Sequence, residues 1–150
     1  MNPTIRRATV EPVDSIAPLF NHYRMFYQQP SDEALARQFI GERLQRGESV
    51  IFLAEVGGKV VGFTQLFPSF SSVRAARAFV LNDLYVDVAA RRLGVARALL
   101  QTAADFARAD GAIRLELETD PDTRSAQALY RHMGWELSEG TLRFRLSLKA

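Results

Sequence analysis

The 150-residue sequence contains no cysteine, which excludes disulfides, cysteine-ligated metal clusters and any thiol nucleophile supplied by the protein itself. It has only two histidines, His22 and His132, and they are too few and too far apart to argue for a metal site. No stretch is apolar over the length of a membrane span, and the N-terminus lacks the apolar core of a signal peptide. We therefore expect a cytoplasmic protein with no metal ion and no membrane partner.

A strong excess of one charge is also missing. Nineteen basic residues stand against seventeen acidic ones, a net charge of +2, so there is no basic stripe suited to nucleic acid and we expect no such partner. The chain is 47% hydrophobic, and 150 residues suffice for one sizeable core but not comfortably for two. We expect a single domain over residues 1–150.

Hydrophobic periodicity and turn residues predict ten elements in the order β-α-α-β-β-β-α-β-α-β. The hairpin signal is clearest at Gly57-Gly58, because paired glycines accept the positive φ of tight turns, and residues 68–77 read as a polar, flexible connection. The expected strands cover residues 4–10, 49–56, 59–67, 78–88, 113–118 and 141–148, and the expected helices cover residues 15–29, 31–47, 94–110 and 120–134. The fold class is α/β (α+β), a mixed, mostly antiparallel sheet flanked by helices.

One connection in this order is a crossover. The chain passes from the strand around Leu84 through the helix that begins at Gly94 to the strand around Leu115, so these two strands should be parallel neighbours. A ligand crevice is expected at the carboxyl ends of such a pair.

Three arginines, Arg91, Arg92 and Arg97, surround Gly94 where that helix begins. The first N–H groups of a helix lack intrahelical partners, and with the helix dipole they form an anion site that glycine leaves open to close approach. The alternative is a solvated arginine cluster on a strand–helix turn, and spacing alone does not decide between the two.

Arg91-x-x-Gly94-x-Ala96, with "LNDLYVDV" before it and "AQALYRHMGW" after it, resembles the acetyl-CoA signature Gln/Arg-x-x-Gly-x-Gly/Ala of the GCN5-related N-acetyltransferase (GNAT) superfamily. The resemblance covers nearly the whole chain and extends to the branch with histone and polyamine acetyltransferases. It implies an acetyl-CoA-dependent N-acetyltransferase that acts on a primary amine, namely a polyamine, another small amine or a lysine side chain, by direct attack in a ternary complex. The alternative is an acetyl-CoA-binding sensor or interaction module of the same fold.

The resemblance also implies where the cofactor binds. Backbone of Leu84, Tyr85 and Val86 would pair with the pantetheine arm as an added strand, and a bulge near Leu84 would aim an N–H at the thioester oxygen. Thr123 stands where the family usually has a cofactor-binding asparagine, so its contact, direct or through water, stays open. The residues implied around the pyrophosphate are Arg91, Arg92, Leu93, Gly94, Val95, Ala96 and Arg97.

Tyr130 matches the family tyrosine that protonates the departing thiolate, although its helical spacing equally fits a packing aromatic. Asp83 and Glu118 are the candidate bases for the incoming ammonium, and Glu118 has the alternative of lying on the solvated face of an alternating strand.

Five residues are candidates for the acceptor site. Asn82 and Asp83 are polar within an apolar strand, and aromatic rings can sandwich an amine through cation–π contact. The aromatic candidates are Tyr23, Tyr27 and Phe70, and loop anchoring is the preferred explanation for Phe70. The alternating segment Thr141–Leu148 and the exposed strand edges make a homodimer a candidate assembly.

Overall fold

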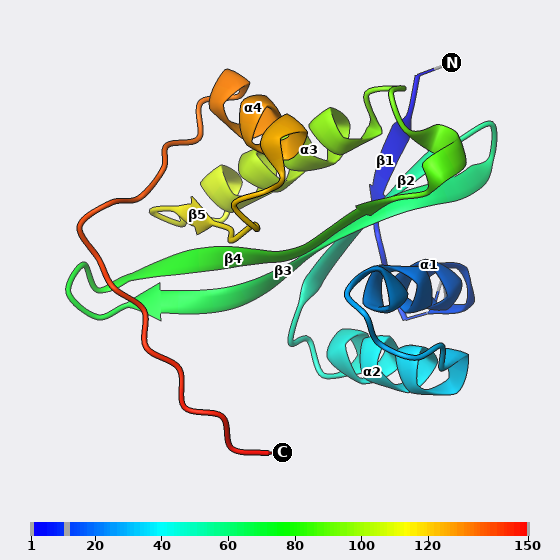
Figure 1. Cartoon of the computed structure of the whole chain (residues 1–150), viewed down its shortest axis with the longest axis horizontal. Coiled ribbons are helices and arrows are strands. Elements are labelled where there is room, and N and C mark those ends of the chain that lie inside the picture. Colours follow the sequence, from blue (N-terminus) through cyan, green and yellow to red (C-terminus); the bar gives the residue numbers. More distant parts are fainter. Residues whose placement is uncertain (1, 11–12, 150) are drawn as a thin grey trace. The chain divides into compact units, whose positions relative to one another are not determined.

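The computed structural model describes residues 2–10 and 13–149, and the chain divides into two compact units, Met1–Glu118 and Thr119–Ala150. The described residues of the second unit, 119–149, form one helix, α4 (Arg124–His132). The first unit contains β1 (Thr4–Arg7), α1 (Val13–Phe26), α2 (Glu33–Gln45), β2 (Val50–Val56), β3 (Lys59–Ser71), β4 (Ala76–Val86), the 3-10 turn η1 (Val88–Ala90), α3 (Val95–Ala109) and β5 (Leu115–Glu116) (Figure 1).

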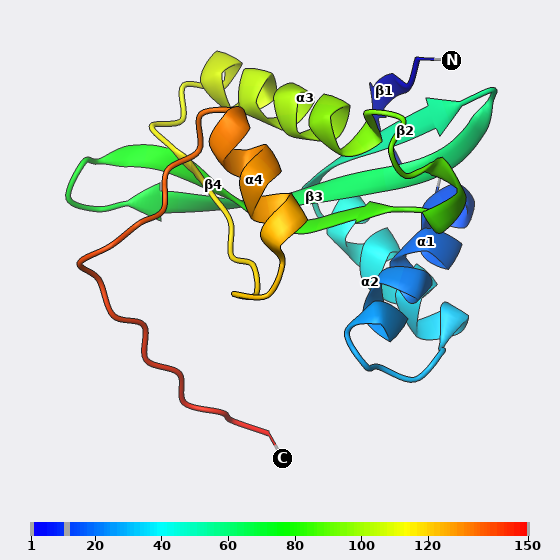
Figure 2. The same ribbon diagram turned by 45° about the horizontal axis from the view of Figure 1, so that its top comes forward.

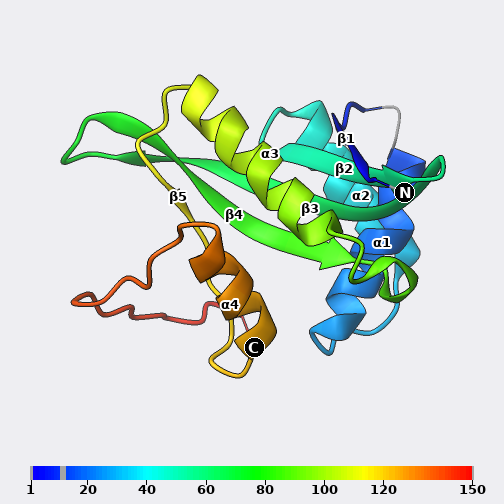
Figure 3. The same cartoon turned by 90° about the horizontal axis from the view of Figure 1, so that it is seen from above.

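The strands of the first unit form one sheet in the order β1-β2-β3-β4-β5. All neighbours are antiparallel except β4 and β5, which are parallel, so the mixed, mostly antiparallel sheet and its parallel crossover are confirmed. Helices α1 and α2 cover one face of this sheet, and α3 crosses the other (Figures 2 and 3).

Strand β2 is buried on both faces and therefore holds the two layers together. Ile51 and Leu53 are fully buried and pack with α1 and α2. Phe52 points to the other face, where its ring meets Phe106 of α3 edge to face at 5.6 Å. A strand covered on both sides reads as a continuous apolar run, as "VIFLA" does here.

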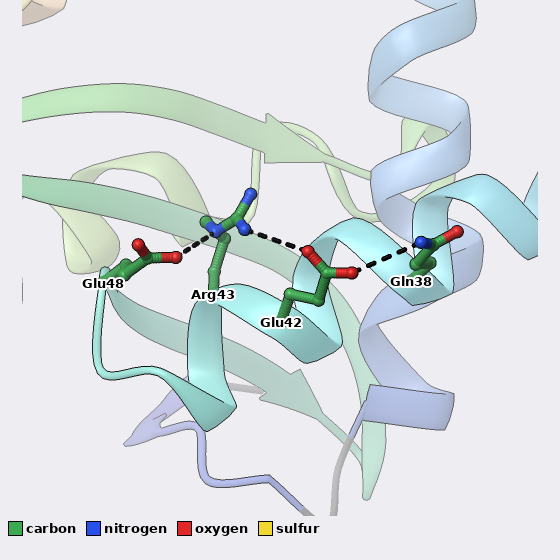
Figure 4. A network of polar contacts seen from close by, with 4 residues as sticks. All are labelled: Gln38, Glu42, Arg43 and Glu48. Atoms are coloured by element: carbon green, nitrogen blue, oxygen red, sulfur yellow. Dashed lines mark hydrogen bonds and ion pairs between the residues drawn. The ribbon is translucent and has the colours of Figure 1, made fainter.

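A chain of polar contacts joins the end of α2 to the start of β2 (Figure 4). Arg43 Nε donates to Glu48 Oε1 at 2.9 Å, and Arg43 Nη2 donates to Glu42 Oε2 at 3.3 Å. The other oxygen of the Glu42 carboxylate accepts a hydrogen bond from the Gln38 side chain. The guanidinium also lies 4.4 Å from the centre of the Phe39 ring. The network fixes the loop that delivers the chain into β2, and it lies apart from the residues predicted to act in function.

The expected flexible connection over residues 68–77 is wrong, because β3 continues to Ser71 and β4 begins at Ala76. Phe70 pairs with Arg77 across the two strands, and the Arg77 guanidinium lies 5.2 Å from the Phe70 ring. Pro68 is tolerated within β3 because β2 ends its pairing at Leu66, so no ladder on that side needs the missing N–H.

The strand expected over Thr141–Leu148 is also wrong, because the described part of this segment forms no strand and Figure 1 draws it as coil. Alternation gives a segment two chemically distinct faces, but a strand forms only when a neighbouring edge pairs with it. β5 is likewise shorter than expected, at Leu115–Glu116. Among the described helices, none is both long and apolar enough to cross a membrane.

Gly62 of β3 is expected to tolerate no side chain. A Cβ there would lie 2.9 Å from the Tyr85 carbonyl oxygen and 3.2 Å from Val95 Cγ1, so Gly62→Ala should destabilise the fold by about 1–3 kcal/mol in a chemical-denaturation measurement. Gly41→Ala in α2 is the matched control, since its Cβ meets only Val13 at 3.8 Å, and it should raise stability by up to about 1 kcal/mol. Equal effects of the two substitutions would contradict the close approach.

Candidate functional site

A β-bulge lies in the middle of β4. Gln65 pairs with Asp83 and Leu66 pairs with Leu81, so Asn82 is an extra residue that has no pairing partner on β3. The bulge expected near Leu84 lies two residues earlier in the structure, at Asn82. A bulge bends its strand and re-aims the neighbouring side chains.

The bulge turns the Asp83 carboxyl inward, where it is 2% exposed. Gln65 Nε2 donates to Asp83 Oδ2 at 2.5 Å, and Asn82 Nδ2 donates to Asp83 Oδ1 at 2.8 Å. The Thr64 hydroxyl donates to the Asp83 carbonyl oxygen at 2.7 Å. Both carboxyl oxygens are thus hydrogen-bonded, which is what an acid group needs in order to be buried without a cation.

Three tyrosines, from α1, the turn after it and β4, form a cluster beside this carboxyl. The Tyr23 hydroxyl donates to the Asn82 carbonyl oxygen at 3.1 Å. The Tyr23 ring meets the Tyr27 ring at 5.1 Å and the Tyr85 ring at 6.4 Å, both edge to face. Tyr27 is 51% exposed, so the cluster reaches from the buried carboxyl to the surface.

Burial changes the acidity of both groups. It raises the pKa of Asp83 above the usual carboxyl range, and hydrogen bonds from Asn82, Gln65 and Tyr23 lower that pKa in part. Burial, and then the neighbouring Asp83 charge, raise the pKa of the Tyr23 hydroxyl. A carboxyl group with a raised pKa is a stronger base than an ordinary one once it is ionised.

The start of α3 provides an open set of donors. The Ala98 N–H donates to the Gly94 carbonyl at 3.0 Å, so the N–H groups of Val95, Ala96 and Arg97 come before this bond and have no acceptor within the helix. Gly94 has φ +78° and no side-chain cap, and a Cβ there would meet nothing within 4 Å.

The arginines beside Gly94 differ from one another. Arg92 adopts a positive φ of 67°, unusual for a residue other than glycine. The Arg91 guanidinium turns back, donating from Nε to the Val86 carbonyl at 3.1 Å and lying 5.9 Å from the Tyr85 ring centre. Arg91 therefore braces the loop against β4, although both Arg91 and Arg92 are exposed.

Strand β4 has an open side next to this loop. β5 pairs with β4 only through Phe79 and Val80. Beyond Val80, the side of β4 turned away from β3 faces no strand among residues 2–10 and 13–149, and Leu84, Tyr85 and Val86 lie on this stretch.

The second unit holds two of the predicted site residues. Tyr130 is half-buried on α4, and its ring lies 6.1 Å from that of Trp135. The Thr123 hydroxyl donates to the Asp120 carbonyl oxygen at 2.7 Å and lies 2.7 Å from the Thr119 hydroxyl. The hydroxyl hydrogen of Thr123 is thus donated within the turn that precedes α4.

The remaining predicted residues are not gathered at the carboxyl. Glu118 is exposed two residues beyond the end of β5. Phe70 is 70% exposed on β3, five residues past Gln65 and so roughly 17 Å along the strand. The first unit therefore brings together Tyr23, Tyr27, Asn82 and Asp83, and it does not bring Phe70 to them.

Gln65 is a site residue that sequence reasoning missed. It is 1% exposed, bonds Asp83, and has a second amide atom, Oε1, that is buried without a hydrogen-bond partner among the described residues. The available signal was a polar amide within the apolar strand "VVGFTQLF", the same signal that singled out Asn82 and Asp83. No group of three or more potential metal ligands occurs in the described part of the chain.

The chain belongs to a known family. The model of the Acetyltransferase (GNAT) family matches residues 16–135, so the family predicted from the sequence is confirmed and the chain is an N-acetyltransferase by class. Enzymes of this family generally use acetyl-CoA.

Three individual proteins are similar to it. "Uncharacterized N-acetyltransferase YhfO" of Bacillus subtilis (strain 168) is 44% identical over 97% of this chain and 98% of its own length. A solved structure described as "Crystal structure of a probable acetyltransferase" is 40% identical with a TM-score of 0.93, covering 98% of this chain and 99% of that one. "Thialysine N-epsilon-acetyltransferase" of Caenorhabditis elegans is 31% identical over 63% of this chain and 61% of its own.

The residues of the first unit fit acetyl-CoA on two observations. The uncapped start of α3, with open space at Gly94, offers N–H donors and positive charge of the kind that phosphate groups bind. The open side of β4 offers backbone groups of the kind that an extended amide chain pairs with.

The raised pKa of Asp83 should make stability fall as pH rises. The folded chain keeps the Asp83 proton to a higher pH than the unfolded chain, so this part of the stability is present below the ordinary carboxyl range and is lost as pH rises through the raised pKa. Asparagine cannot ionise. The melting temperature of Asp83→Asn minus that of the parent should therefore increase as pH rises from the ordinary carboxyl range through the raised pKa of Asp83.

Asp122→Asn, at an exposed carboxylate in the second unit, is the matched control, and its difference from the parent should not change with pH in this way. The quantity to compare is the change of this melting-temperature difference with pH. Its absolute size is not used, because the new amide also changes the hydrogen bonds to Gln65 and Asn82. A melting-temperature difference between Asp83→Asn and the parent that does not change with pH would contradict the raised pKa of Asp83.

Proposed function

We propose that this chain transfers the acetyl group of acetyl-CoA to a primary amine by direct attack in a ternary complex. The observation that carries the proposal is the buried, hydrogen-bonded carboxyl of Asp83 at a bulge of β4, beside the open side of the same strand. Bound acetyl-CoA supplies a thioester, whose carbonyl carbon accepts the amine nitrogen as its C–S bond breaks and thiolate leaves.

The cofactor is held by main-chain groups. The N–H groups that open α3, with Arg92 beside them, bind the pyrophosphate, and the backbone of Leu84 to Val86 pairs with the pantetheine arm. Arg91 contributes by bracing the loop through its bond to Val86. This arrangement leaves the side chains of β4 to the acceptor.

Asp83 is the base that takes the proton of the incoming ammonium, directly or through water. An amine attacks only as the free base, and the burial that raises the pKa of Asp83 brings its basicity closer to what proton transfer near neutral pH needs. The rings of Tyr23 and Tyr27, whose centres lie 5.1 Å apart, are the candidates for cation–π contact with the incoming ammonium. Glu118 stays a predicted alternative base, and the exposure of its side chain favours Asp83 over it.

Tyr130 is the acid that gives a proton to the departing thiolate. The O–H group of its phenol can donate the proton that the thiolate needs, and the role of proton donor is the one that the resemblance to the family implies for this tyrosine. The acceptor class is supported by the name of the Caenorhabditis elegans relative, which refers to an ε-amine. The cytoplasmic location and the homodimer expected from the sequence stay predictions.

The test is a thiol-release assay with acetyl-CoA and a panel of polyamines, amino acids, lysine peptides and aminoglycosides. Release of free thiol that depends on one amine class, with the acetylated amine detected by mass spectrometry, is the expected result. Tight binding of acetyl-CoA without release on the whole panel would instead favour the sensor or interaction module.

Arg92→Glu should weaken acetyl-CoA binding about ten-fold or more, because it replaces a cation beside the phosphate-binding N–H groups with an anion. Isothermal titration calorimetry measures this affinity. Arg74→Glu makes the same charge change in the turn between β3 and β4, and it should leave the affinity unchanged. An unaltered affinity for Arg92→Glu would disprove the phosphate site.

Tyr130→Phe should lower kcat about 100-fold while the affinity for acetyl-CoA changes little, because only the proton donor is lost. Steady-state kinetics and calorimetry on the same preparation separate the two quantities. Tyr27→Phe is a suitable control, since it removes a hydroxyl from a ring proposed to act through its face. Near-normal kcat in Tyr130→Phe would show that another group protonates the thiolate.

A further inference from the structure

Gln65 is a polar side chain in the middle of the sheet of the first unit. β3 lies between β2 and β4, and Gln65 pairs with Ile51 on one side and with Asp83 on the other. Residues that pair directly share a face of the sheet, and Ile51 packs in the core cluster with residues of α1 and α2. The side chains of Gln65 and Asp83 therefore lie in the layer between the sheet and these two helices.

The Gln65 amide makes one hydrogen bond. Its Nε2 donates to Asp83 Oδ2 at 2.5 Å, while its Oε1 is buried and has no hydrogen-bond partner among residues 2–10 and 13–149. A buried acceptor without a partner lowers the stability of a fold, and an apolar side chain of the same length would avoid that loss. Packing alone thus does not explain an amide here, and the one group that it serves is the Asp83 carboxyl.

The hydrogen bond from Gln65 favours the ionised form of Asp83. An amide N–H only donates and a carboxylate only accepts, whereas a neutral acid group is a weaker acceptor. Burial raises the pKa of Asp83, and hydrogen bonds from Asn82, Gln65 and Tyr23 lower it, with no cation contributing in the described part of the chain. In a buried layer such bonds are stronger than in water, so donors replace the missing cation.

The surroundings of Asp83 contain few other groups that titrate. From α1 the hydroxyl of Tyr23 faces the carboxyl, and the neighbouring charge and burial raise the pKa of that hydroxyl. The buried residues of α2, Ala36 and Ile40, do not titrate. The other titratable rings of the cluster are those of Tyr27 and Tyr85, which meet the Tyr23 ring. The charge of Asp83 therefore depends on hydrogen-bond donors.

We propose that Gln65 is a positioning residue: its amide holds the Asp83 carboxyl in the ionised form that accepts the proton of the incoming ammonium. In that step one N–H bond of the ammonium breaks and an O–H bond forms on Asp83, leaving a free amine and a neutral acid. The role rests on the proposed function, in which Asp83 is the base. Asn82 also donates, but it is the adjacent residue in the chain, whereas Gln65 ties the carboxyl to a second strand.

The first test is a pH titration of the Asp83 carboxyl by NMR in the full chain with isotope-labelled aspartate. The signal is assigned by its absence from Asp83→Asn. Gln65→Met keeps the length of the side chain and removes its donor, so the midpoint of the titration should rise by about one to two pH units. An unmoved midpoint would overturn the proposal.

Thr64→Val is the matched control. It also removes a buried polar group of β3 that bonds Asp83, but the Thr64 hydroxyl bonds the backbone carbonyl oxygen and not the carboxyl. This variant should lower the free energy of unfolding and leave the midpoint where the parent has it. An equal rise of the midpoint in Thr64→Val would show that any loss of packing in β3 has this effect, and would overturn the proposal.

Gln65→Glu is a second variant that keeps the shape of the side chain. It places a carboxyl at hydrogen-bond distance from Asp83, and two such groups repel each other when both are ionised. The midpoint should rise further than in Gln65→Met. This variant decides the question if Gln65→Met does not fold, and an unmoved midpoint would again overturn the proposal.

Kinetics link the hydrogen bond to the reaction. With saturating acetyl-CoA and the amine that gives the highest rate in the thiol-release panel, kcat/KM of Gln65→Met should fall about 10- to 100-fold below both midpoints and recover at higher pH. A purely structural loss would lower kcat/KM at every pH and would overturn the positioning role. A midpoint that moves while the acidic limb of kcat/KM does not would overturn Asp83 as the base and leave its hydrogen bond to Gln65 supported.

Discussion

The extra residue at Asn82 is the constraint on which the candidate site depends. Because β4 has one residue more than β3 at this point, the strand bends immediately after its two pairs with β5 at Phe79 and Val80. The same irregularity turns the Asp83 carboxyl into the layer under α1. One local departure from regular pairing thus accounts for both the open backbone of Leu84 to Val86 and the buried acid beside it.

Burying that acid requires a polar environment within an apolar sheet. Gln65 and Thr64 are almost fully buried and bond the side chain and backbone of Asp83. Strand β2, packed on both faces, and the Arg43 network that leads into it supply the rigid support. The site therefore combines a two-layer scaffold with a few polar groups that bond one another within the first unit.

The parts of the fold and of the candidate site that depend on local sequence were predictable. The Gly57-Gly58 turn, the helix after Gly94 and the parallel crossover depend on short-range signals, and each was confirmed. The bulge at Asn82 depends on register between distant strands, which no local pattern encodes, so Gln65 was missed as the partner of Asp83. The alternating residues 141–148 were wrongly predicted as a strand, because alternation gives a segment two chemically different faces but does not by itself make a strand.

The hydroxyl of Tyr23 has a consequence for how pH–rate profiles of this protein are read. Burial and the adjacent carboxyl both raise the pKa of this hydroxyl, and the hydroxyl donates a hydrogen bond to the Asn82 carbonyl oxygen. It remains a neutral phenol throughout the range in which enzymes are assayed, so it acts as a fixed dipole and never as a titrating group. An acidic or alkaline limb in such a profile belongs to another residue, or to the amine itself.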